Sequence, residues 1–290
     1  MRTLDANPTL PPAVENALAT AIDDPGRRTV TVASGIPFSA IAWGDVSASP
    51  LILIHGITAS ARIWWRVGPA LAASGRRVIA LDLPGHGQTG HWIGHHRFRD
   101  NATDVAAWVR AADVDRPDLE VVGHSWGAMT AAALPIAGIR PRRLVLLDPP
   151  CVPFAVISRM ASDPSEVTYP DLETAIAAVT RENPAWSAED VQAKAEALVE
   201  LDIEAARSVL LENGDWDGGL SSLTEPAAAG VAIRMTRGDP EAGSYVPDTA
   251  IPAFEAVIGE GNVATMPGAA HAPQRLQPAQ TTAGILAALA

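Results

Sequence analysis

Short hydrophobic runs alternate with longer amphipathic stretches along most of the chain. The runs contain four to six residues and several are continuously apolar, which is typical of strands buried on both faces of a sheet. Because stretches with helical spacing separate them, the pattern predicts an α/β fold, with a mostly parallel eight-stranded sheet flanked by helices. The predicted strands are Thr29–Ala33, Phe38–Trp43, Leu51–Ile54, Val78–Leu81, Leu119–Val122, Leu144–Leu147, Val231–Met235 and Val263–Met266. The predicted helices are Ser60–Ala73, Arg97–Ala112, Trp126–Ala137, Pro252–Ile258 and Pro273–Ala290.

The alternation breaks once, after the sixth predicted strand. Between Leu147 and Val231 no strand pattern occurs, and the stretches Leu172–Val179 and Ser187–Leu211 have helical spacing. We therefore predict a helical cap (lid) domain inserted into a core domain. The predicted core comprises residues 1–148 and 229–290, and the predicted cap comprises residues 149–228.

Composition narrows the classes of function. The 290 residues are 48% hydrophobic and 19% charged, which excludes global disorder, and the net charge of −12 disfavours binding to nucleic acid. A single cysteine, Cys151, excludes an intrachain disulfide and a multi-cysteine metal site. The N-terminal segment does not resemble a signal peptide, and no apolar stretch is long enough to span a membrane. We therefore expect a cytoplasmic protein with no membrane partner, and a homodimer is compatible with this sequence.

The segment Gly123–Gly127 (GHSWG) fits the pattern G-x-S-x-G and lies between a predicted strand and a predicted helix. That context is the one in which the pattern forms a sharp turn that exposes a nucleophilic serine, here Ser125. The turn His55–Thr58 (HGIT) follows another buried strand, and its glycine allows the backbone to bend sharply. We expect the main-chain amides of Ile57 and Trp126 to form an oxyanion hole beside Ser125.

Four segments in this order resemble the α/β-hydrolase superfamily, in its cap-containing branch. They are HGIT at 55–58, DLPGHGQT at 82–89, GHSWG at 123–127 and GAAHAP at 268–273. The resemblance implies Ser125 as the nucleophile, His271 as the base, the Ile57 and Trp126 amides as the oxyanion hole, and a helical cap. It also implies that 82–89 is a structural loop near the nucleophile.

Chain order independently favours His271 as the general base. The order of a catalytic triad in this fold is serine, acid, histidine, and of the seven histidines only His271 follows Ser125. Two aspartates fit the order as the acid: Asp148 ends the sixth predicted strand, and Asp239 follows the seventh. We favour Asp148, because an additional segment Glu241–Gly243 changes the spacing after Asp239, and Glu241 is a third candidate.

Other aromatic and histidine residues have less specific patterns. Trp43 and Trp108 are expected in the core, and His91, His95 and His96 are expected to be solvated loop histidines rather than metal ligands. Large rigid side chains that converge on one cleft suit an apolar substrate. The candidate substrate-binding residues are Trp64, Trp65, Trp186 and Trp216.

These features predict a serine hydrolase that cleaves an ester or lactone of a small hydrophobic molecule without a metal or organic cofactor. A perhydrolase or haloperoxidase, or a C–C bond hydrolase, on the same triad is an alternative, and a non-catalytic small-molecule receptor is an alternative of another class. Epoxide hydrolases and dehalogenases of the family are expected to use an aspartate nucleophile, so Ser125 argues against both.

The predicted cap carries most of the net charge. Between Pro150 and Glu225 there are fifteen acidic and four basic residues, a net charge of −11, whereas the rest of the chain carries −1. A solvated outer helix face is the ordinary explanation. A sharper hypothesis is that the cap disfavours anionic substrates relative to neutral ones.

Overall fold

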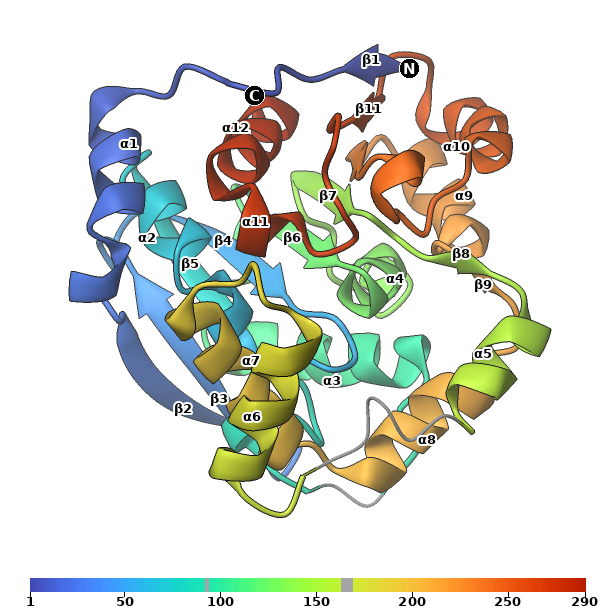
Figure 1. Cartoon of the computed structure of the whole chain (residues 1–290). Helices are drawn as coiled ribbons and strands as arrows, with labels where there is room; N and C mark the ends of the chain where they lie inside the picture. The colour runs from blue at the N-terminus through green and yellow to red at the C-terminus, as the bar shows by residue number, and fades with distance from the viewer. Residues whose placement is uncertain (92–93, 163–168) are drawn as a thin grey trace.

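The centre of the molecule is a twisted, mostly parallel sheet (Figure 1). The computed structural model describes residues 1–91, 94–162 and 169–290. The nine strands of its main sheet lie in the order β1-β11-β10-β7-β6-β4-β5-β3-β2, and only the β2–β3 and β3–β5 pairs are antiparallel. They are β1 Arg2–Thr3, β2 Arg27–Ala33, β3 Ile36–Trp43, β4 Ser49–Ile54, β5 Arg76–Leu81, β6 Glu120–His124, β7 Arg143–Leu147, β10 Ala232–Arg237 and β11 Val263–Thr265.

The eight predicted strands are all present, and β1 is an additional ninth strand. It is two residues long, exposed and polar, and it pairs with β11 in parallel register. No hydrophobic run marks such a strand, because the backbone of β11 rather than a buried side-chain face holds it in place.

Helices cover both faces of the sheet, because successive strand residues point to opposite faces and both sets are apolar. Leu51 and Leu53 of β4 pack into one core with α2 and α12, whereas Ile52 and Ile54 pack into the other with α3, α4 and α10. The core helices are α1 Pro12–Ala19, α2 Val67–Ala72, α3 Phe98–Ala111, α4 Trp126–Ala133, α9 Leu220–Ala228, α10 Ile251–Ile258, α11 Pro273–Leu276 and α12 Pro278–Leu289. Short 3-10 helices are η1 Ala21–Asp23, η2 Ala61–Trp64, η3 Gly87–Thr89, η5 Pro240–Ala242 and η6 Asp248–Ala250.

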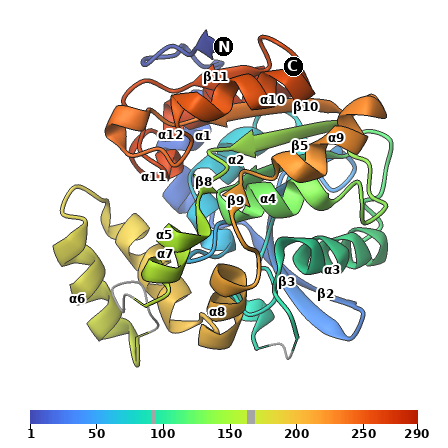
Figure 2. The same cartoon turned by 90° about the vertical axis from the view of Figure 1, so that its right-hand side faces the viewer.

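Four further helices lie together at the end of the molecule opposite the termini (Figure 2). They are α5 Phe154–Met160, α6 Leu172–Glu182, α7 Ala188–Val199 and α8 Ile203–Leu211. The chain enters and leaves this group through a small antiparallel pair, β8 Cys151–Val152 and β9 Trp216–Asp217. The range predicted as a cap also contains α9, which contacts the core helices α4 and α10. The division into two domains therefore remains a prediction.

Three predicted helices are interrupted where the backbone has a local reason to turn. The stretch 60–73 forms η2 and α2, and 273–290 divides at Gln277, just before Pro278. The stretch 187–211 divides at Asp202, whose side chain accepts a hydrogen bond from the Glu204 amide and caps α8. Within the described residues, no helix combines the length and the apolar character needed to cross a membrane.

Candidate active site

Ser125 lies in the tight turn between β6 and α4, as its sequence pattern predicts. Its φ of 54° is in the left-handed region, which is rare for a residue with a side chain. The two flanking glycines make the turn sterically possible. A Cβ on Gly123 would lie 2.2 Å from the Gly127 carbonyl oxygen, and one on Gly127 would lie 2.4 Å from the His55 carbonyl oxygen. The pattern G-x-S-x-G is therefore required here by close backbone approach.

Ser125, His271 and Asp148 form a continuous hydrogen-bonded chain. His271 Nε2 is 2.8 Å from Ser125 Oγ, and His271 Nδ1 is 2.5 Å from Asp148 Oδ2. An ionised carboxylate only accepts, so Nδ1 carries the proton and Nε2 presents its lone pair to the serine hydroxyl. This arrangement can remove the serine proton and stabilise the imidazolium that results.

Asp148 is fully buried and held from several directions. The Gly238 amide and the Ser244 hydroxyl donate to Oδ1 at 2.8 and 2.5 Å, and the Tyr245 amide donates to Oδ2 at 3.3 Å. Burial by itself raises the pKa of Asp148, but the hydrogen bond and the charge of His271, with the other donors, bring the pKa below its ordinary value. The side chain is thus kept as a carboxylate.

The two other candidate acids are not in contact with His271. Asp239 caps η5 and accepts hydrogen bonds from the Glu241 and Gly268 amides at 3.0 and 2.8 Å. These two bonds lower the pKa of Asp239, and they fix the start of the loop that carries His271. Glu241 is exposed on the same turn. The segment Glu241–Gly243 lengthens the loop after Asp239, and the residues that follow it, Ser244 and Tyr245, donate hydrogen bonds to Asp148.

The turn after β4 comes close to Ser125. A Cβ on Gly56 would lie 3.0 Å from Ser125 Cβ and 3.4 Å from Ser125 Oγ. Within the described part of the chain, no protein acceptor takes the amide proton of Ile57 or of Trp126, the first residue of α4. Two unpaired amides beside a serine are the donors that a developing oxyanion requires.

The four candidate substrate-binding tryptophans occupy different environments. Trp216 packs against Trp126 with ring centroids 5.5 Å apart, and Trp64 is fully buried next to His124. Trp186 stacks with Arg275 in the small core of α6 and α7. Trp43 and Trp108 are 3% and 2% exposed, which confirms the prediction that they are core residues.

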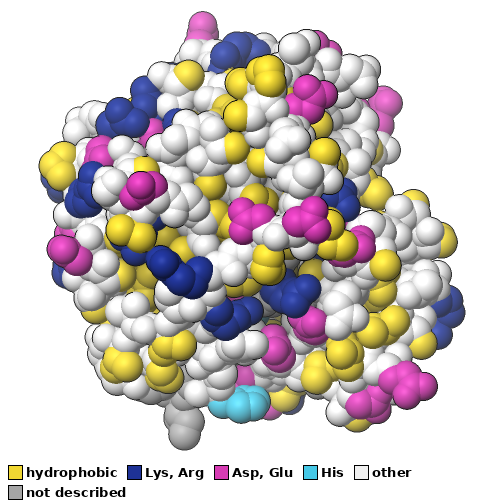
Figure 3. Space-filling view, turned by 90° about the vertical axis from the view of Figure 1, so that its left-hand side faces the viewer, with side chains coloured by type: hydrophobic (Ala, Val, Ile, Leu, Met, Phe, Trp, Pro, Cys, Tyr) yellow, Lys and Arg dark blue, Asp and Glu magenta, His cyan; other side chains and the backbone are white. Residues whose placement is uncertain are grey.

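Trp65 lines a groove that is separate from Ser125. The groove has a volume of about 700 Å³ and lies between α1 and the start of α7 and α12, and Leu10, Leu18 and Pro278 also line it. Neither Ser125 nor His271 is among its lining residues. Hydrophobic side chains and charged side chains of both signs are interspersed over this side of the molecule (Figure 3).

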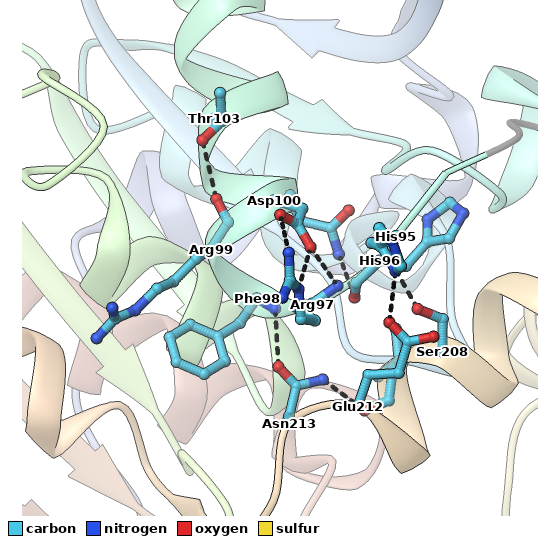
Figure 4. A network of polar contacts seen from close by, with 12 residues as sticks. His95, His96, Arg97, Phe98, Arg99, Asp100, Thr103, Ser208, Glu212 and Asn213 are labelled. Carbon is cyan, nitrogen blue, oxygen red and sulfur yellow. Dashed lines mark hydrogen bonds and ion pairs between the residues drawn. The ribbon is translucent and has the colours of Figure 1, made fainter.

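The prediction that His91, His95 and His96 are all solvated is wrong for His96. His91 and His95 have exposed rings that pair with Asp202 and Glu212 at the two ends of α8. His96 is 2% exposed, and its amide donates to the hydroxyl of Ser208 on α8 (Figure 4). This segment therefore joins the core to α8. No cluster of three or more potential metal ligands occurs among the described residues.

Sequence reasoning missed three buried histidines that support the site. His124 Nε2 is 2.8 Å from the carbonyl oxygen of His271, His86 Nε2 is 2.7 Å from that of Ile57, and His55 Nδ1 is 2.7 Å from that of Gly56. Burial lowers the pKa of His55 to about 4, and burial together with neighbouring histidines lowers the pKa of His86 and His124 to about 3. All three are therefore neutral. The only available signal was their position inside the motifs.

Comparison with known proteins agrees with this fold. A family model described as "alpha/beta hydrolase fold" matches residues 49–200, just over half of the chain. Among solved structures, an E-2-(acetamidomethylene)succinate hydrolase is similar with a TM-score of 0.73 at 20% identity, over 90% of this chain and 98% of that one.

Curated relatives match over shorter stretches. The dihydrolipoyllysine-residue acetyltransferase component of the acetoin cleaving system of Pseudomonas putida is 37% identical over 105 residues, 36% of this chain and 27% of that protein. A haloalkane dehalogenase of Mesorhizobium japonicum is 36% identical over 109 residues, 37% of this chain and 34% of that protein. The matched stretch thus spans about a third of these relatives or less.

Proposed function

The chain belongs to the α/β-hydrolase fold family, and from this premise we propose that it is a serine hydrolase acting on a carboxylic ester or lactone of a hydrophobic small molecule. The observation that carries the proposal is the chain of hydrogen bonds from Ser125 Oγ through His271 to Asp148, at 2.8 and 2.5 Å. Supporting it are the two unpaired amides of Ile57 and Trp126 next to the serine. An apolar substrate is proposed because Trp126, beside the nucleophile, lies in an aromatic cluster with Trp216 and Phe98.

The proposed reaction proceeds through an acyl-enzyme. His271 Nε2 takes the proton of Ser125 as Oγ attacks the carbonyl carbon, and the Ile57 and Trp126 amides bind the oxyanion. Collapse of the tetrahedral intermediate breaks the C–O bond, and the His271 imidazolium returns the proton to the leaving alcohol. Water, deprotonated by His271, then attacks the acyl-enzyme. The bond between Ser125 Oγ and the acyl carbon breaks, the His271 imidazolium returns its proton to Oγ, and the carboxylic acid is released. Asp148 holds the tautomer and stabilises the imidazolium throughout.

The identity of the nucleophile separates this proposal from the chemistry of one relative. The matching stretch of the dehalogenase is 36% identical, but an aspartate nucleophile is expected in family members of that class. Ser125 can form an acyl-enzyme with an ester, whereas displacing a halide from an alkyl carbon calls for a carboxylate. Ser125 therefore supports the proposal of a serine hydrolase rather than a dehalogenase.

A fluorophosphonate probe and a substrate panel test the proposal together. We expect the probe to form one covalent adduct at Ser125, and we expect turnover of medium-chain esters or lactones that the Ser125→Ala variant loses. The absence of an adduct with a correctly folded protein would favour a binding protein. Peracid formation from acetate and hydrogen peroxide, with negligible ester turnover, would instead assign a perhydrolase activity to the same residues.

A further inference from the structure

The loop after Asp239 presents an exposed aromatic ring to the base of the candidate triad. The ring centroids of Tyr245 and His271 lie 4.5 Å apart, and the two ring planes are nearly perpendicular, at 77°. Tyr245 is 41% exposed. By contrast, Trp126 and Trp216, near the nucleophile, are 0% and 5% exposed. Of these three aromatic residues, Tyr245 therefore offers by far the most accessible ring to a ligand that approaches the triad.

Main-chain contacts determine where this ring lies. The Tyr245 amide donates to Asp148 Oδ2 at 3.3 Å, and the Tyr245 carbonyl oxygen accepts from the Cys151 amide at 3.0 Å. The next residue, Val246, is fully buried, and its carbonyl oxygen accepts from the buried guanidinium of Arg237 at 2.9 Å. On the side of the loop, all these bonds involve main-chain atoms. A change of side chain at position 245 therefore leaves them in place.

The proposed reaction brings the leaving alcohol to the same imidazole. The amides of Ile57 and Trp126 bind the carbonyl oxygen of the ester, so the leaving oxygen is the one that faces His271. His271 passes its proton from Nε2 to that oxygen, which must therefore come within about 2.6–3.2 Å of Nε2. The carbon attached to the leaving oxygen then lies close to the imidazole as well. An exposed ring packed against this imidazole is therefore within reach of an alcohol group of more than a few atoms.

We propose that Tyr245 is a specificity-determining residue whose ring packs against the alcohol part of the ester substrate. This inference rests on the proposed function, because it needs His271 to protonate the leaving alcohol. Aromatic rings gain most from partners that are themselves flat and apolar, in edge-to-face or offset-stacked contact. The chemical class that fits is therefore an ester of an aromatic alcohol, in preference to an ester of a small aliphatic alcohol.

Two esters with the same acyl group test this assignment. Benzyl butanoate and ethyl butanoate form the same acyl-enzyme and differ only in the leaving alcohol. We expect the wild type to prefer the benzyl ester in kcat/KM, and we expect Tyr245→Ala to lose about 3- to 10-fold of that preference, as for one aromatic contact. Tyr245→Phe keeps the ring and should keep the preference within about twofold. Ile136→Ala, an exposed apolar position beyond the end of α4 that is remote from Ser125, is the control and should match the wild type.

Deacylation separates specificity from a supporting role. Hydrolysis of the shared acyl-enzyme uses His271 and Asp148 again, but the leaving alcohol has already departed. The single-turnover rate of deacylation in Tyr245→Ala should therefore stay within about twofold of the wild type. Equal losses for the two esters, together with a matching loss in deacylation, would show that the ring supports His271 and would overturn the inference. An unchanged benzyl preference in Tyr245→Ala would also overturn it.

Acyl transfer to an added alcohol gives a second readout. Benzyl alcohol can attack the acyl-enzyme in place of water, with its hydroxyl proton passing to His271, and this step is the reverse of acylation by the benzyl ester. Because both directions share one transition state, the ratio of benzyl ester to acid formed should fall in Tyr245→Ala by about the same factor as the benzyl preference. A ratio equal to that of the wild type would contradict the proposed contact.

Failure of the proposed function gives a different result from failure of this inference. If the chain is not a serine hydrolase, the wild type shows no probe adduct at Ser125 and no turnover. A wild type that forms the adduct but hydrolyses the ethyl ester as well as the benzyl ester, or neither of them, would overturn the role of Tyr245 and leave the nucleophile in place.

Discussion

At the scale of single residues, Ser125 and Asp148 share an unusual backbone conformation. Their φ values are 54° and 45°, in the left-handed region that residues with a Cβ rarely adopt, and each costs about 1–3 kcal/mol. The neighbouring strands hold both: the Ser125 amide donates to the Leu147 oxygen at 3.0 Å, and the Asp148 amide donates to the Thr236 oxygen at 2.9 Å. Strain at both sites is thus held in place by the ends of β7 and β10.

Substitution of the two candidate acids separates their roles. Asp148→Asn should lower kcat by about 10³- to 10⁴-fold, because an amide does not hold the Nδ1–H tautomer of His271. Asp239→Asn should stay within a few-fold of the wild type, since the bonds that Asp239 accepts from described residues come from the main-chain amides of Glu241 and Gly268 and not from His271. Steady-state kinetics on the best ester found, with circular dichroism to verify folding, measure both. A larger loss of kcat in Asp239→Asn than in Asp148→Asn would identify Asp239, and not Asp148, as the acid of the triad.

Asp104 on α3 should make stability depend on pH. Burial, with a smaller effect of Asp100, raises its pKa from 3.8 to about 6. A raised folded-state pKa means that the ionised carboxylate destabilises the fold above about pH 6, and that this penalty disappears as the pH falls toward 3.8. Asp104→Asn should therefore raise Tm by a few degrees at pH 8 and by nothing at pH 4. Exposed Asp115→Asn is the control. A gain in Tm that does not vary with pH would contradict the assignment.

Residue patterns indicated the candidate nucleophile and the candidate base but not the contacts that support them. Ser125 stands out because it lies in the G-x-S-x-G motif, and His271 stands out because the order serine, acid, histidine requires a histidine after Ser125. The choice between Asp148 and Asp239 depends on which carboxylate faces His271, and that is decided by contacts with Gly238 and Ser244, ninety or more residues along the chain from Asp148. His55 and His86 resembled ordinary turn residues, because a side-chain contact to a carbonyl leaves no periodic signal.

At the scale of secondary structure, Asp190 connects α7 to both sides of the candidate site. This carboxylate is 2% exposed, accepts from Trp65 Nε1 at 3.0 Å and from Ser187 Oγ at 2.9 Å, and lies 3.7 Å from the Arg66 guanidinium. The carbonyl oxygen of Asp190 accepts a hydrogen bond at 2.9 Å from Arg275, which follows His271 by four residues in the chain. The start of α7 is thereby fixed to the segment after the oxyanion turn and to the loop of the base.

Removal of that carboxylate should loosen α7 before it unfolds the molecule. Asp190→Ala removes the acceptor of the half-buried Trp65 N–H and Ser187 hydroxyl, at a cost of about 1 kcal/mol. We expect faster hydrogen exchange in residues 188–199 and a smaller effect in Asp190→Asn, which keeps an acceptor oxygen. Glu189→Ala, at the neighbouring position, is the control. Unchanged exchange in α7 with a lowered global Tm would show that Asp190 supports the core instead.

The strands were predictable from sequence and the helix boundaries were less so. Runs such as Leu51–Ile54 are apolar on both faces, and a short run of this kind is typical of a strand buried inside a parallel sheet. The periodicity in 187–211 continues through Asp202, so only the capping contact there reveals the break between α7 and α8. Helix α9 escaped prediction, because Pro226 and its serines resemble a loop, yet Leu223 and Pro226 are buried against the core.

At the scale of the whole molecule, the site lies at one edge of the sheet, where the carboxyl ends of parallel strands meet. His55 and Ile57 follow β4, Ser125 follows β6, and Asp148 follows β7. His271 follows β11 at the same edge, which is where ligands bind in open α/β sheets. This placement follows from strand order alone. The sequence therefore predicted that the candidate residues meet at this edge, but it did not predict their detailed contacts.

The uneven charge of the molecule leads to a prediction about substrate preference. The segment 150–225 carries −11 of the total −12, and its helices α5–α8 form the end of the molecule opposite the termini (Figure 2). For two esters of equal length, one neutral and one ending in a carboxylate, the neutral one should have the higher kcat/KM at low salt. The ratio should fall as ionic strength rises, because the Debye length shrinks from about 30 Å at 0.01 M to about 3 Å at 1 M.

A charge variant shows whether these acidic residues are the cause. Glu173, Glu182 and Glu204 are exposed, so replacing all three by glutamine leaves the buried contacts intact. The triple variant should treat the anionic ester more nearly like the neutral one at low salt and should show a weaker salt dependence, while kcat/KM for the neutral ester stays unchanged. A neutral-to-anionic ratio that does not depend on salt in the wild type would mean that this charge belongs to a solvated surface without influence on the substrate.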